Sequence, residues 1–524
     1  MRMARAVWIS AATMSSRLLG LVREQLFAAL VGANQFSDAF VAAFRIPNLL
    51  RDLFAEGALS SAFVPTFADY RQNRGAAEAF RLANLVTGLV LALVGAVVLL
   101  GLALAHPVAR FIAPGFGVEQ SLLTAELARL MMPFLLLVSL AATSMGMLNA
   151  QGRFTAPALA PALFNVGAIG VGLGLWAAGA GPRAAVVGWS LGTLLGGLLQ
   201  LLGQLPSLRA TGWRFRPRLA GALREPGVRR IAGLMAAAVV GLSATQVNIF
   251  VNTIFASQEP RAVTWLNFAF RLMQFPLGVF GVAVATVAGA GVARAAAERD
   301  PAAARETLGQ AMRLVAFLNV PSAVGLVVLA QPIVAVVYEH GRFGVEDTAG
   351  TAQALACYAI GLYAYSGVKV LAPAFYAFGE ARVAVAGSAL GMAANLALNL
   401  ALHPVLGYRG VAIGTSLAAW ANFGVLAVAW RRRHGGFGGA GLLRHLVRVG
   451  ACSACLALGA WGAHRALAAS AAGPGVGAQL LLAFGPIGAG ALAYLAAARL
   501  LGVRELGEVW AALRRKDPGA GPAT

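Results

Sequence analysis

Residues 15–67 read SSRLLGLVREQLFAALVGANQFSDAFVAAFRIPNLLRDLFAEGALSSAFVPTF. This stretch is long and apolar enough for two membrane-spanning helices, yet it holds four arginines and four carboxylates: Arg17, Arg23, Glu24, Asp38, Arg45, Arg51, Asp52 and Glu56. An arginine facing lipid at the bilayer centre costs about 2.5–3.5 kcal/mol, so four would cost on the order of 10–14 kcal/mol before any pairing. We therefore expect these charges to line a hydrated interior, and the hairpin is the first candidate for a functional site.

The composition is that of an all-α polytopic membrane protein. The chain has 524 residues, of which 59% are hydrophobic and 12% charged, with a mean hydropathy of +0.74. Soluble domains have about 25% charged residues. The excess of 41 Lys and Arg over 20 Asp and Glu is typical of cytoplasmic loops in a membrane protein. Nucleic acid is therefore not an expected partner.

Apolar segments long enough to cross a bilayer, about 20 residues, occur fourteen times. The expected spans are residues 6–31, 37–67, 82–105, 121–148, 156–179, 184–207, 229–256, 262–293, 307–337, 348–376, 383–405, 408–430, 446–467 and 478–499. With a cytoplasmic N-terminus, the inner segments hold 28 of the 41 Lys and Arg and the outer loops hold six. Because a missed span would destroy this positive-inside asymmetry, we predict fourteen spans with both termini in the cytoplasm.

An internal repeat divides the chain. Three pairs of sites recur at an offset of 226 or 227: AFR at 43–45 and 269–271, GWSL at 188–191 with GTSL at 414–417, and Gly152 with Gly379. An even number of spans in the repeated unit predicts a parallel duplication. The predicted domains are an N-terminal lobe (1–226, spans 1–6), a C-terminal lobe (227–436, spans 7–12) and a segment with two extra helices and a cytoplasmic tail (437–524). Ionisable residues of the first two helices of each lobe are expected to converge in a central cleft.

The charges of the hairpin have a helical spacing. The offsets i, i+6 and i+7 occur twice, at Arg17, Arg23 and Glu24 and at Arg45, Arg51 and Asp52. Since i+7 returns near the starting face of a helix, Glu24 is expected on the face of Arg17, and Asp52 and Glu56 on that of Arg45. Each helix can then pair one arginine and leave another available. Pro47 removes a backbone donor and is expected to bend the second span.

Several arginines in a wet membrane cavity suit an anion, because the guanidinium is a planar fork for phosphate or carboxylate and stays charged when partly desolvated. Arg17, Arg23, Arg51 and Arg271 together would suit a doubly charged group such as a pyrophosphate. The alternative is that they form structural salt bridges between helices. Lys369, inside the span 348–376, is expected to touch substrate, to snorkel or to pair with a carboxylate.

Motifs for chemistry at a covalent bond are not found. The sequence holds no Walker A loop, no nucleophile–base motif and no metalloprotease motif, and its six histidines are scattered. We therefore predict a transporter rather than an enzyme, with no cofactor and no bound metal.

Three segments resemble the MurJ/MviN family of lipid II flippases: SRLLGLVRE at 16–24, SDAFVAAFRIPNLLRDLFAEGALSSAFVPTF at 37–67 and FRLMQFPLGVFGVAVAT at 270–286. The resemblance covers the whole chain and implies the fold of the multidrug/oligosaccharidyl-lipid/polysaccharide exporter superfamily. It also implies the activity, movement of the lipid-linked disaccharide-pentapeptide precursor of peptidoglycan from the inner to the outer leaflet of the bacterial cytoplasmic membrane.

The resemblance also implies roles for residues. The family's cavity arginines match Arg17, Arg23, Arg51 and Arg271, its acidic positions match Asp38 and Glu56, and Ser16 and Asn48 fall in the matched motifs as supporting residues with Arg45 and Lys369. Glu24 and Asp52 join the acidic residues as gating or charge-pairing groups. The last two spans would form a hydrophobic groove for the polyprenyl tail. Some members are said to bind sodium through an aspartate in the seventh span, but residues 229–256 hold no carboxylate, which argues against a sodium site.

Three functions remain open. The first is alternating-access flipping of lipid II, with membrane lipids and cell-wall synthesis proteins as further partners. The second is cation-coupled drug export within the same superfamily, against which the arginines and the fourteen spans argue. The third is flipping of another polyprenyl-pyrophosphate-linked glycan, or a non-transporting scaffold for cell-wall assembly.

Overall fold

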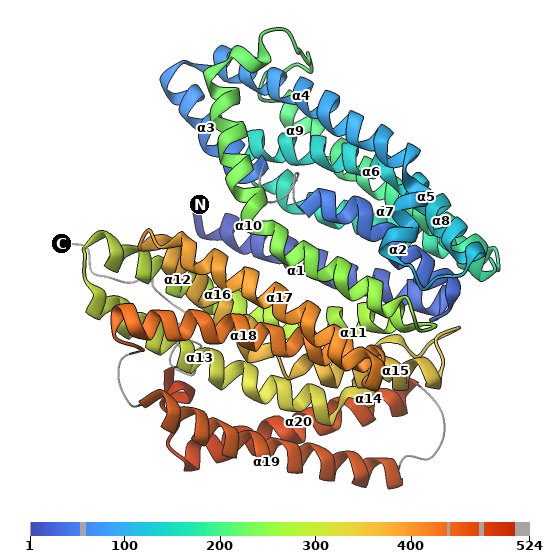
Figure 1. Cartoon of the computed structure of the whole chain (residues 1–524), viewed down its shortest axis with the longest axis vertical. Helices are drawn as coiled ribbons and strands as arrows, with labels where there is room; N and C mark the ends of the chain where they lie inside the picture. Colours follow the sequence, from blue (N-terminus) through green and yellow to red (C-terminus); the bar gives the residue numbers. More distant parts are fainter. Residues whose placement is uncertain (1, 53–58, 438–440, 471–475, 509–524) are drawn as a thin grey trace. The chain divides into compact units, whose positions relative to one another are not determined.

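The computed structural model describes residues 2–52, 59–437, 441–470 and 476–508, and in this part of the chain the regular elements are all helices (Figure 1). The all-α prediction is therefore confirmed for the described residues. Helices satisfy their own backbone hydrogen bonds, which is the condition for crossing the hydrocarbon core.

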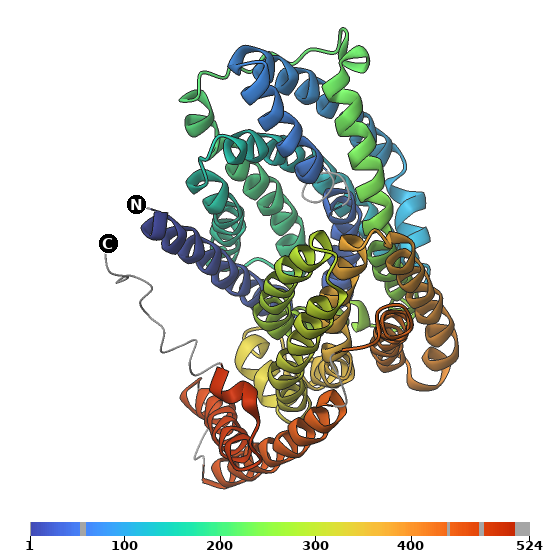
Figure 2. The same ribbon diagram turned by 90° about the vertical axis from the view of Figure 1, so that its left-hand side faces the viewer.

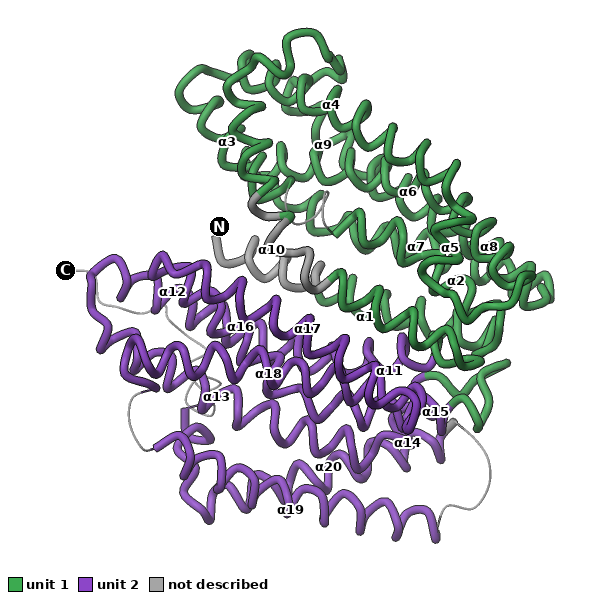
Figure 3. The backbone as a smooth tube through the Cα atoms, in the orientation of Figure 1, with its two compact units in different colours: residues 1–264, 338–347 green, residues 265–337, 348–524 purple. Residues whose placement is uncertain are grey.

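The chain divides into two compact units (Figure 3). Unit 1 comprises residues 1–264 and 338–347, and unit 2 comprises residues 265–337 and 348–524. The predicted boundary at residue 226 comes from the sequence repeat, whereas the two units are defined by how compactly the chain packs. The division into lobes at that residue therefore stays a prediction.

Unit 1 contains the charged hairpin and the helices packed around it. Its helices are α1 (Arg2–Val31), α2 (Gln35–Leu50), α3 (Ser60–Asn73), α4 (Ala76–Ala103), α5 (Ala105–Ile112), α6 (Val118–Ala150), α7 (Thr155–Ala177), α8 (Pro182–Leu202), α9 (Leu205–Arg209), the 3₁₀ turn η2 (Ala222–Arg224) and α10 (Pro226–Ala256). A core of Phe63, Phe67, Leu82, Met147 and Trp213 joins α3, α4, α6 and the segment after α9.

Unit 2 contains the later helices. They are α11 (Ala262–Pro276), η3 (Leu277–Gly281), α12 (Val282–Ala297), α13 (Pro301–Val328), α14 (Ala330–Tyr338), α15 (Val345–Ala359), α16 (Leu362–Ala377), α17 (Ala381–Leu406), α18 (Tyr408–His434), α19 (Gly441–Ser470) and α20 (Val476–Leu500). The first three residues of α11, the last residue of α14 and the first three residues of α15 belong to unit 1. Figures 1 and 2 both show α19 and α20 side by side, and α13 packs against α19.

Local sequence explains where key helices begin. Asn34 caps α2: its side chain accepts from the N–H groups of Phe36 and Ser37, and the Ser37 hydroxyl accepts in return from the Asn34 N–H. This reciprocal capping box satisfies donors that a helix N-terminus leaves open. The Asp300 side chain caps α13, ahead of Pro301 at the first helical position.

Ten helices of the described chain are long and apolar enough to cross a membrane, and α15 with α16, bent by 45°, makes an eleventh as one broken span. The protein is therefore a multi-pass membrane protein. The predicted count of fourteen requires that α1, α2 with α3, and α10 also cross, and it stays a prediction.

Two proline residues mark breaks in spans that carry arginines. Pro47 lies within α2, which ends at Leu50 and continues into a π-helical turn at residues 51 and 52. Pro276 ends α11 and is followed by the π-helical turn Leu277–Gly281 before α12 continues. Proline removes a helix donor, and π-turns occur frequently at functional sites. The bend expected at Pro47 stays a prediction.

The repeated glycines form the same turn. Gly152 has φ 72° and Gly379 has φ 74°, a left-handed conformation that glycine adopts without strain. In each case the glycine N–H bonds three residues back and the next N–H bonds five residues back, to Leu148 and Phe375 respectively. The match is local, so the duplication of whole lobes remains a prediction.

The C-terminal end of unit 2 is tied to α13 and α19 by a buried ion-pair cluster. Glu505 pairs with Arg313 of α13 at 3.2 Å and with Nδ1 of His445 of α19 at 3.2 Å. His445 Nε2 lies 3.0 Å from the Arg313 carbonyl oxygen. Burial by itself raises the pKa of Glu505, but the hydrogen bond with His445 and the positive charge of Arg313 outweigh it and hold this pKa below its ordinary value.

A depressed carboxyl pKa predicts the sign of a pH effect. Its contribution to stability is present above the unfolded-state pKa and is lost as the pH falls through the folded-state pKa. We expect Glu505→Gln to lower the free energy of unfolding by about 2 kcal/mol at pH 7, the scale of a hydrogen bond to a charged group. Thermal unfolding of the purified protein between about pH 7 and pH 3.5 checks this, a range that passes through the carboxyl pKa. A gap between wild type and variant that does not narrow at low pH would contradict it.

Candidate functional site

Arg23 and Glu24 form an ion pair on α1. Arg23 Nη2 lies 2.5 Å from Glu24 Oε1, and the two side chains are only 14% and 12% exposed. The Arg23 guanidinium also lies 5.2 Å from the ring centroid of Phe164 on α7, within cation–π range. The Glu24 carboxylate and the Phe164 ring together hold the Arg23 guanidinium in a mostly buried position.

Arg51 and Asp52 form the corresponding pair at the end of α2. Asp52 Oδ1 accepts from Arg51 Nε at 3.2 Å and from Nη2 at 3.0 Å. Asp52 Oδ2 accepts from Gln246 Nε2 of α10 at 3.2 Å and from Asn48 Nδ2 at 3.5 Å. The Arg51 side chain is 23% exposed, so a ligand could reach it.

The pairing differs from the helical-face expectation. Glu24 pairs with its neighbour Arg23 instead of Arg17, and Asp52 pairs with its neighbour Arg51 instead of Arg45. The reason is the length of the arginine side chain, which allows the guanidinium to fold back onto an adjacent residue despite the angle of about 100° between their Cα–Cβ bonds. Arg45 donates instead to the Ile249 carbonyl at 3.1 Å.

Arg17 is the most accessible of the α1 arginines in the predicted site. Its side chain is exposed, and no hydrogen bond or ion pair joins it to another described residue. The carbonyl of Ser16 beside it accepts from Asn165 Nδ2 of α7 at 3.0 Å, which fixes the backbone at this point. Arg17 is therefore placed on an anchored turn with its guanidinium available to a ligand.

Asp38 stabilises the start of α11. Its Oδ2 accepts from the Arg261 N–H at 2.8 Å, and its Oδ1 accepts from the N–H and the hydroxyl of Thr264 at 2.8 and 2.6 Å. The carboxylate is 1% exposed. These are helix N-terminal donors, so Asp38 of α2 supplies a capping carboxylate to another helix.

Hydrogen bonds of Arg342 join the segment 338–347 to the C-terminal end of α1. The Arg342 N–H donates to the Ala29 carbonyl at 2.9 Å, and the Arg342 side chain donates to the carbonyls of Leu30 and Ala180. The approach is close enough to require glycine: a Cβ on Gly341 would lie 2.4 Å from the Ala29 oxygen. The same segment also forms an ion pair, between Glu346 and Arg261 at 2.5 Å.

The predicted set is thus placed unevenly. Arg17, Arg23, Glu24, Asp38, Arg45, Asn48, Arg51 and Asp52 lie in unit 1, whereas Arg271 on α11 and Lys369 on α16 lie in unit 2. Glu56 lies outside the described residues. Within unit 1 the structure brings together Arg23 with Glu24, and Arg51 with Asp52 and Asn48.

Sequence reasoning missed two partners of the predicted residues. Gln246 is a polar residue within a span, and an amide in an apolar helix is itself a signal for a buried hydrogen bond. Thr264 gives no such signal, because its contact with Asp38 spans 226 residues. Among the described residues, no group of three His, Cys, Asp or Glu side chains could hold a metal ion.

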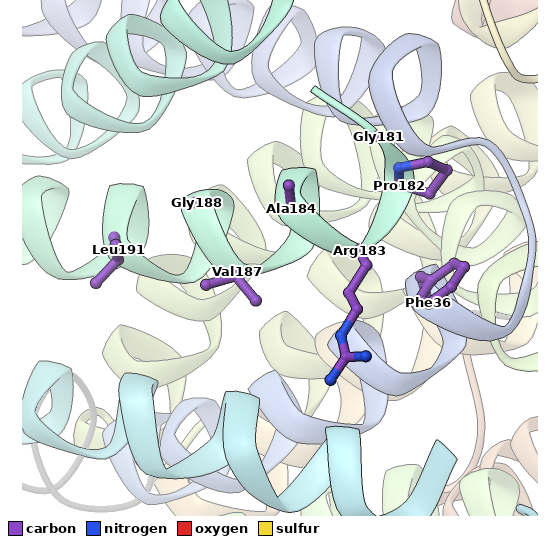
Figure 4. Close-up of a pocket in the computed structure, with 8 residues that line it drawn as sticks. All are labelled: Phe36, Gly181, Pro182, Arg183, Ala184, Val187, Gly188 and Leu191. Carbon is purple, nitrogen blue, oxygen red and sulfur yellow. The ribbon is translucent and has the colours of Figure 1, made fainter. Parts of the chain in front are cut away.

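A separate groove lies at the N-terminal end of α8 (Figure 4). Its volume is about 740 Å³, and it is lined by Phe36, Pro182, Arg183, Val187, Leu191 and three small residues. The lining is apolar apart from Arg183. None of the predicted site residues lies in it.

The Asp38 cap can be tested by substitution. We expect Asp38→Ala to destabilise the protein by about 3 kcal/mol, because two backbone N–H groups and one hydroxyl lose a buried charged acceptor. Amide hydrogen exchange should accelerate at residues 259–266. Ser37→Ala removes the hydroxyl that lies 3.0 Å from the Thr264 hydroxyl and that also accepts from the Asn34 N–H in the capping box of α2. As a control it should cost about 1 kcal/mol through the lost capping bond and should leave exchange at residues 259–266 unchanged. Equal effects of the two variants would refute the capping role.

Comparison with solved structures defines the class of fold. The structure described as an inward-facing conformation of a multidrug resistance MATE family transporter of the MOP superfamily has a TM-score of 0.65 and 17% identity, covering 85% of this chain and 98% of that one. The structure described as lipid II flippase MurJ, inward closed conformation, has a TM-score of 0.77 and 23% identity, covering 97% of this chain and all of the other. The chain therefore shares the fold of these two solved structures.

Comparison with sequences defines the family. The family model described as lipid II flippase MurJ matches residues 27–473. A relative from Rhizobium meliloti (strain 1021), described as a probable lipid II flippase MurJ, is 37% identical over 438 residues, which cover 82% of this chain and 80% of the relative. The chain belongs to the lipid II flippase MurJ family, and it is a transporter rather than an enzyme.

Proposed function

We propose that this protein moves lipid II, the lipid-linked precursor of peptidoglycan, from the inner to the outer leaflet of the bacterial cytoplasmic membrane. Family membership supports the substrate. The main support for the binding site is that α1 and the end of α2 present partly accessible arginines. Each of these arginines lies on an anchored backbone or is held by a carboxylate.

The pyrophosphate of the substrate is the group that these arginines suit. A guanidinium can bind two phosphate oxygens at once, and the pair is stronger where water is partly excluded. In the unloaded protein Glu24 and Asp52 neutralise Arg23 and Arg51. A bound pyrophosphate would displace these carboxylates from the arginines or share the arginines with them. The two arginines are therefore neutralised in the membrane both with and without substrate. Arg17 completes the proposed set in unit 1, and the sequence prediction adds Arg271 of α11.

We propose alternating access as the transport mechanism. A ligand can shift a conformational equilibrium only by its difference in affinity for the two states. We propose that the Asp38 cap and the Arg342 contacts open during this change, since both join the ends of α1 and α2 to segments from later in the chain. The sugar-peptide would occupy a hydrated cleft, while the tail stays in lipid along α19 and α20.

The topology proposed for this cycle has fourteen spans with both termini in the cytoplasm. We expect a cysteine placed at Ala220, in the Arg-rich loop, to react with a membrane-impermeant thiol reagent only in inverted vesicles. A cysteine at Gly117, ahead of α6, should react in intact spheroplasts. Both variants are made in a chain whose three native cysteines are replaced. Labelling of both positions from one side would contradict the fourteen-span arrangement.

A second candidate, export of organic cations, has one observation in its favour, the likeness of the fold to a MATE family transporter. The side chains argue against it, because a cavity for cations requires unpaired carboxylates or aromatic faces. Here Glu24 and Asp52 are already paired with arginines. Another polyprenyl-pyrophosphate-linked glycan would fit the same arginines. Only a transport assay with lipid II distinguishes the two substrates.

Arg51→Ala tests the role of the arginines. In cells whose only lipid II flippase is this protein, we expect exposure of lipid II in the outer leaflet to fall by roughly 30-fold or more, because losing one partner of a desolvated charge pair costs about 2 kcal/mol or more. Arg51→Lys should restore part of the activity, since it keeps the charge but not the planar fork.

The matched control is Arg110→Ala, an exposed arginine on α5 outside the proposed site. It should leave lipid II exposure unchanged at equal protein levels. Unchanged exposure in Arg51→Ala would reduce Arg51 to a structural role. No exposure with wild type would refute lipid II as the substrate and favour another polyprenyl-linked glycan.

A further inference from the structure

The loop between α9 and α10 is a strongly basic surface with a defined backbone. Residues 209–230 hold seven arginines and one carboxylate, Glu225. Glu225 is already neutralised, because its Oε2 lies 2.8 Å from Arg81 of α4 and its Oε1 accepts from the Tyr70 hydroxyl at 2.8 Å. The positive charge of the loop is therefore uncompensated within it.

The loop is fixed against α4 by backbone contacts and by a buried anchor. The Arg216 N–H donates to the side chain of Asn84, and the Arg218 N–H donates to the Asn84 carbonyl, each at 3.2 Å. Trp213 is buried in the core of unit 1. A Cβ at Gly88 would lie 2.3 Å from the Arg218 carbonyl oxygen, so the close contact requires glycine there.

These contacts point one set of side chains outward. Donation from alternate N–H groups to the same helix is the pattern of an extended chain, in which alternate side chains share a side. Arg214, Arg216 and Arg218 are all exposed, and their guanidinium groups bond to no other residue in the described part of the chain. A row of three guanidinium groups is thus presented on an anchored loop.

The contacts with α4 also set the depth of the loop. The apolar run of α4 begins at Leu82, and Asn84 and Gly88 lie about 3 and 9 Å further along the helix at a rise of about 1.5 Å per residue. The headgroup layer on each side of the hydrocarbon core is about 5–8 Å thick. The loop therefore contacts α4 within the first two turns of its apolar run, which is consistent with a position near the boundary between headgroups and hydrocarbon.

Apolar side chains of the same segment are exposed beside these arginines. Phe215 is 56% exposed, Leu219 56% and Leu223 74%. Exposed leucines of α4 continue beyond the loop, at Leu93 and Leu99. Apolar groups among arginines at the level of the headgroups are the composition of an interfacial membrane anchor.

We infer that Arg214, Arg216 and Arg218 form a binding site for the phosphate groups of anionic phospholipids in the adjacent leaflet, with Phe215, Leu219 and Leu223 inserted between the lipids. The site lies in unit 1 apart from α1 and α2 and requires no transport substrate. Each basic residue near an anionic surface contributes roughly fivefold to binding, so three together contribute on the order of 100-fold.

The test uses the full-length protein in a neutral detergent with added dioctanoyl phosphatidylglycerol or dioctanoyl phosphatidylcholine. Amide hydrogen exchange is followed at residues 206–226, without lipid II. Phosphatidylglycerol should slow exchange in this segment at concentrations on the order of 100-fold lower than phosphatidylcholine, and about 1 M salt should remove the difference because it screens exposed charges.

Three variants make the result decisive. Arg214→Gln/Arg216→Gln/Arg218→Gln should lose the preference for phosphatidylglycerol, whereas the corresponding triple lysine variant should keep most of it. Arg294→Gln/Arg299→Gln/Arg432→Gln removes three exposed arginines of unit 2 and should behave as wild type. Because the loop arginines are exposed and the backbone contacts remain, the glutamine variant should unfold at the wild-type temperature.

Several outcomes would overturn the inference. One is equal protection by the two lipids. Another is equal protection by inorganic phosphate, which would indicate an adventitious ion only. A third is a loss of cellular activity in the glutamine variant with no change in lipid protection, which would assign the surface to a protein partner. If the phospholipid site is refuted, the Arg51 test of lipid II flipping still stands, because it measures lipid II exposure and concerns a different set of arginines.

Discussion

A membrane tolerates a charged side chain only where another group or water compensates its charge, and the first two helices of this protein are organised by that requirement. Arg23 and Arg51 each bind a neighbouring carboxylate, and Asp38 binds the donors at the start of α11. These pairs help four arginines to lie in an apolar hairpin. They also hold the guanidinium groups of Arg23 and Arg51 in place, where the proposed pyrophosphate would compete with the carboxylates.

Two arginine-carrying spans, one containing α2 and the other α11, contain helix breaks. Pro47 and Pro276 each precede a π-helical turn in a span that carries an arginine. A missing donor and an irregular turn leave backbone groups for other partners, and membrane proteins tolerate this only where the backbone is buried in protein or faces water. Arginines and helix breaks therefore occur together near Arg45 and Arg271, which end the two AFR tripeptides 226 residues apart in the sequence.

Much of this could be predicted from the sequence, and the reasons are local. The apolar runs predict helices, Asn34 and Asp300 are typical helix-capping residues, and the charges of residues 15–67 predict a functional hairpin. The pairing within that hairpin could not be predicted in the same way. Helical periodicity assigns Glu24 to the face of Arg17, whereas a flexible arginine side chain reaches its neighbour at a small energetic cost.

The sequence by itself determined the class of protein, the location of its charged helices and the family to which it belongs, because hydropathy and short motifs are properties of neighbouring residues. Only the tertiary structure decided that Asp38 caps a helix more than 220 residues later, that Gln246 binds Asp52, and that the basic loop lies along α4. Such contacts depend on which distant helices pack together. No periodicity within one segment carries that information.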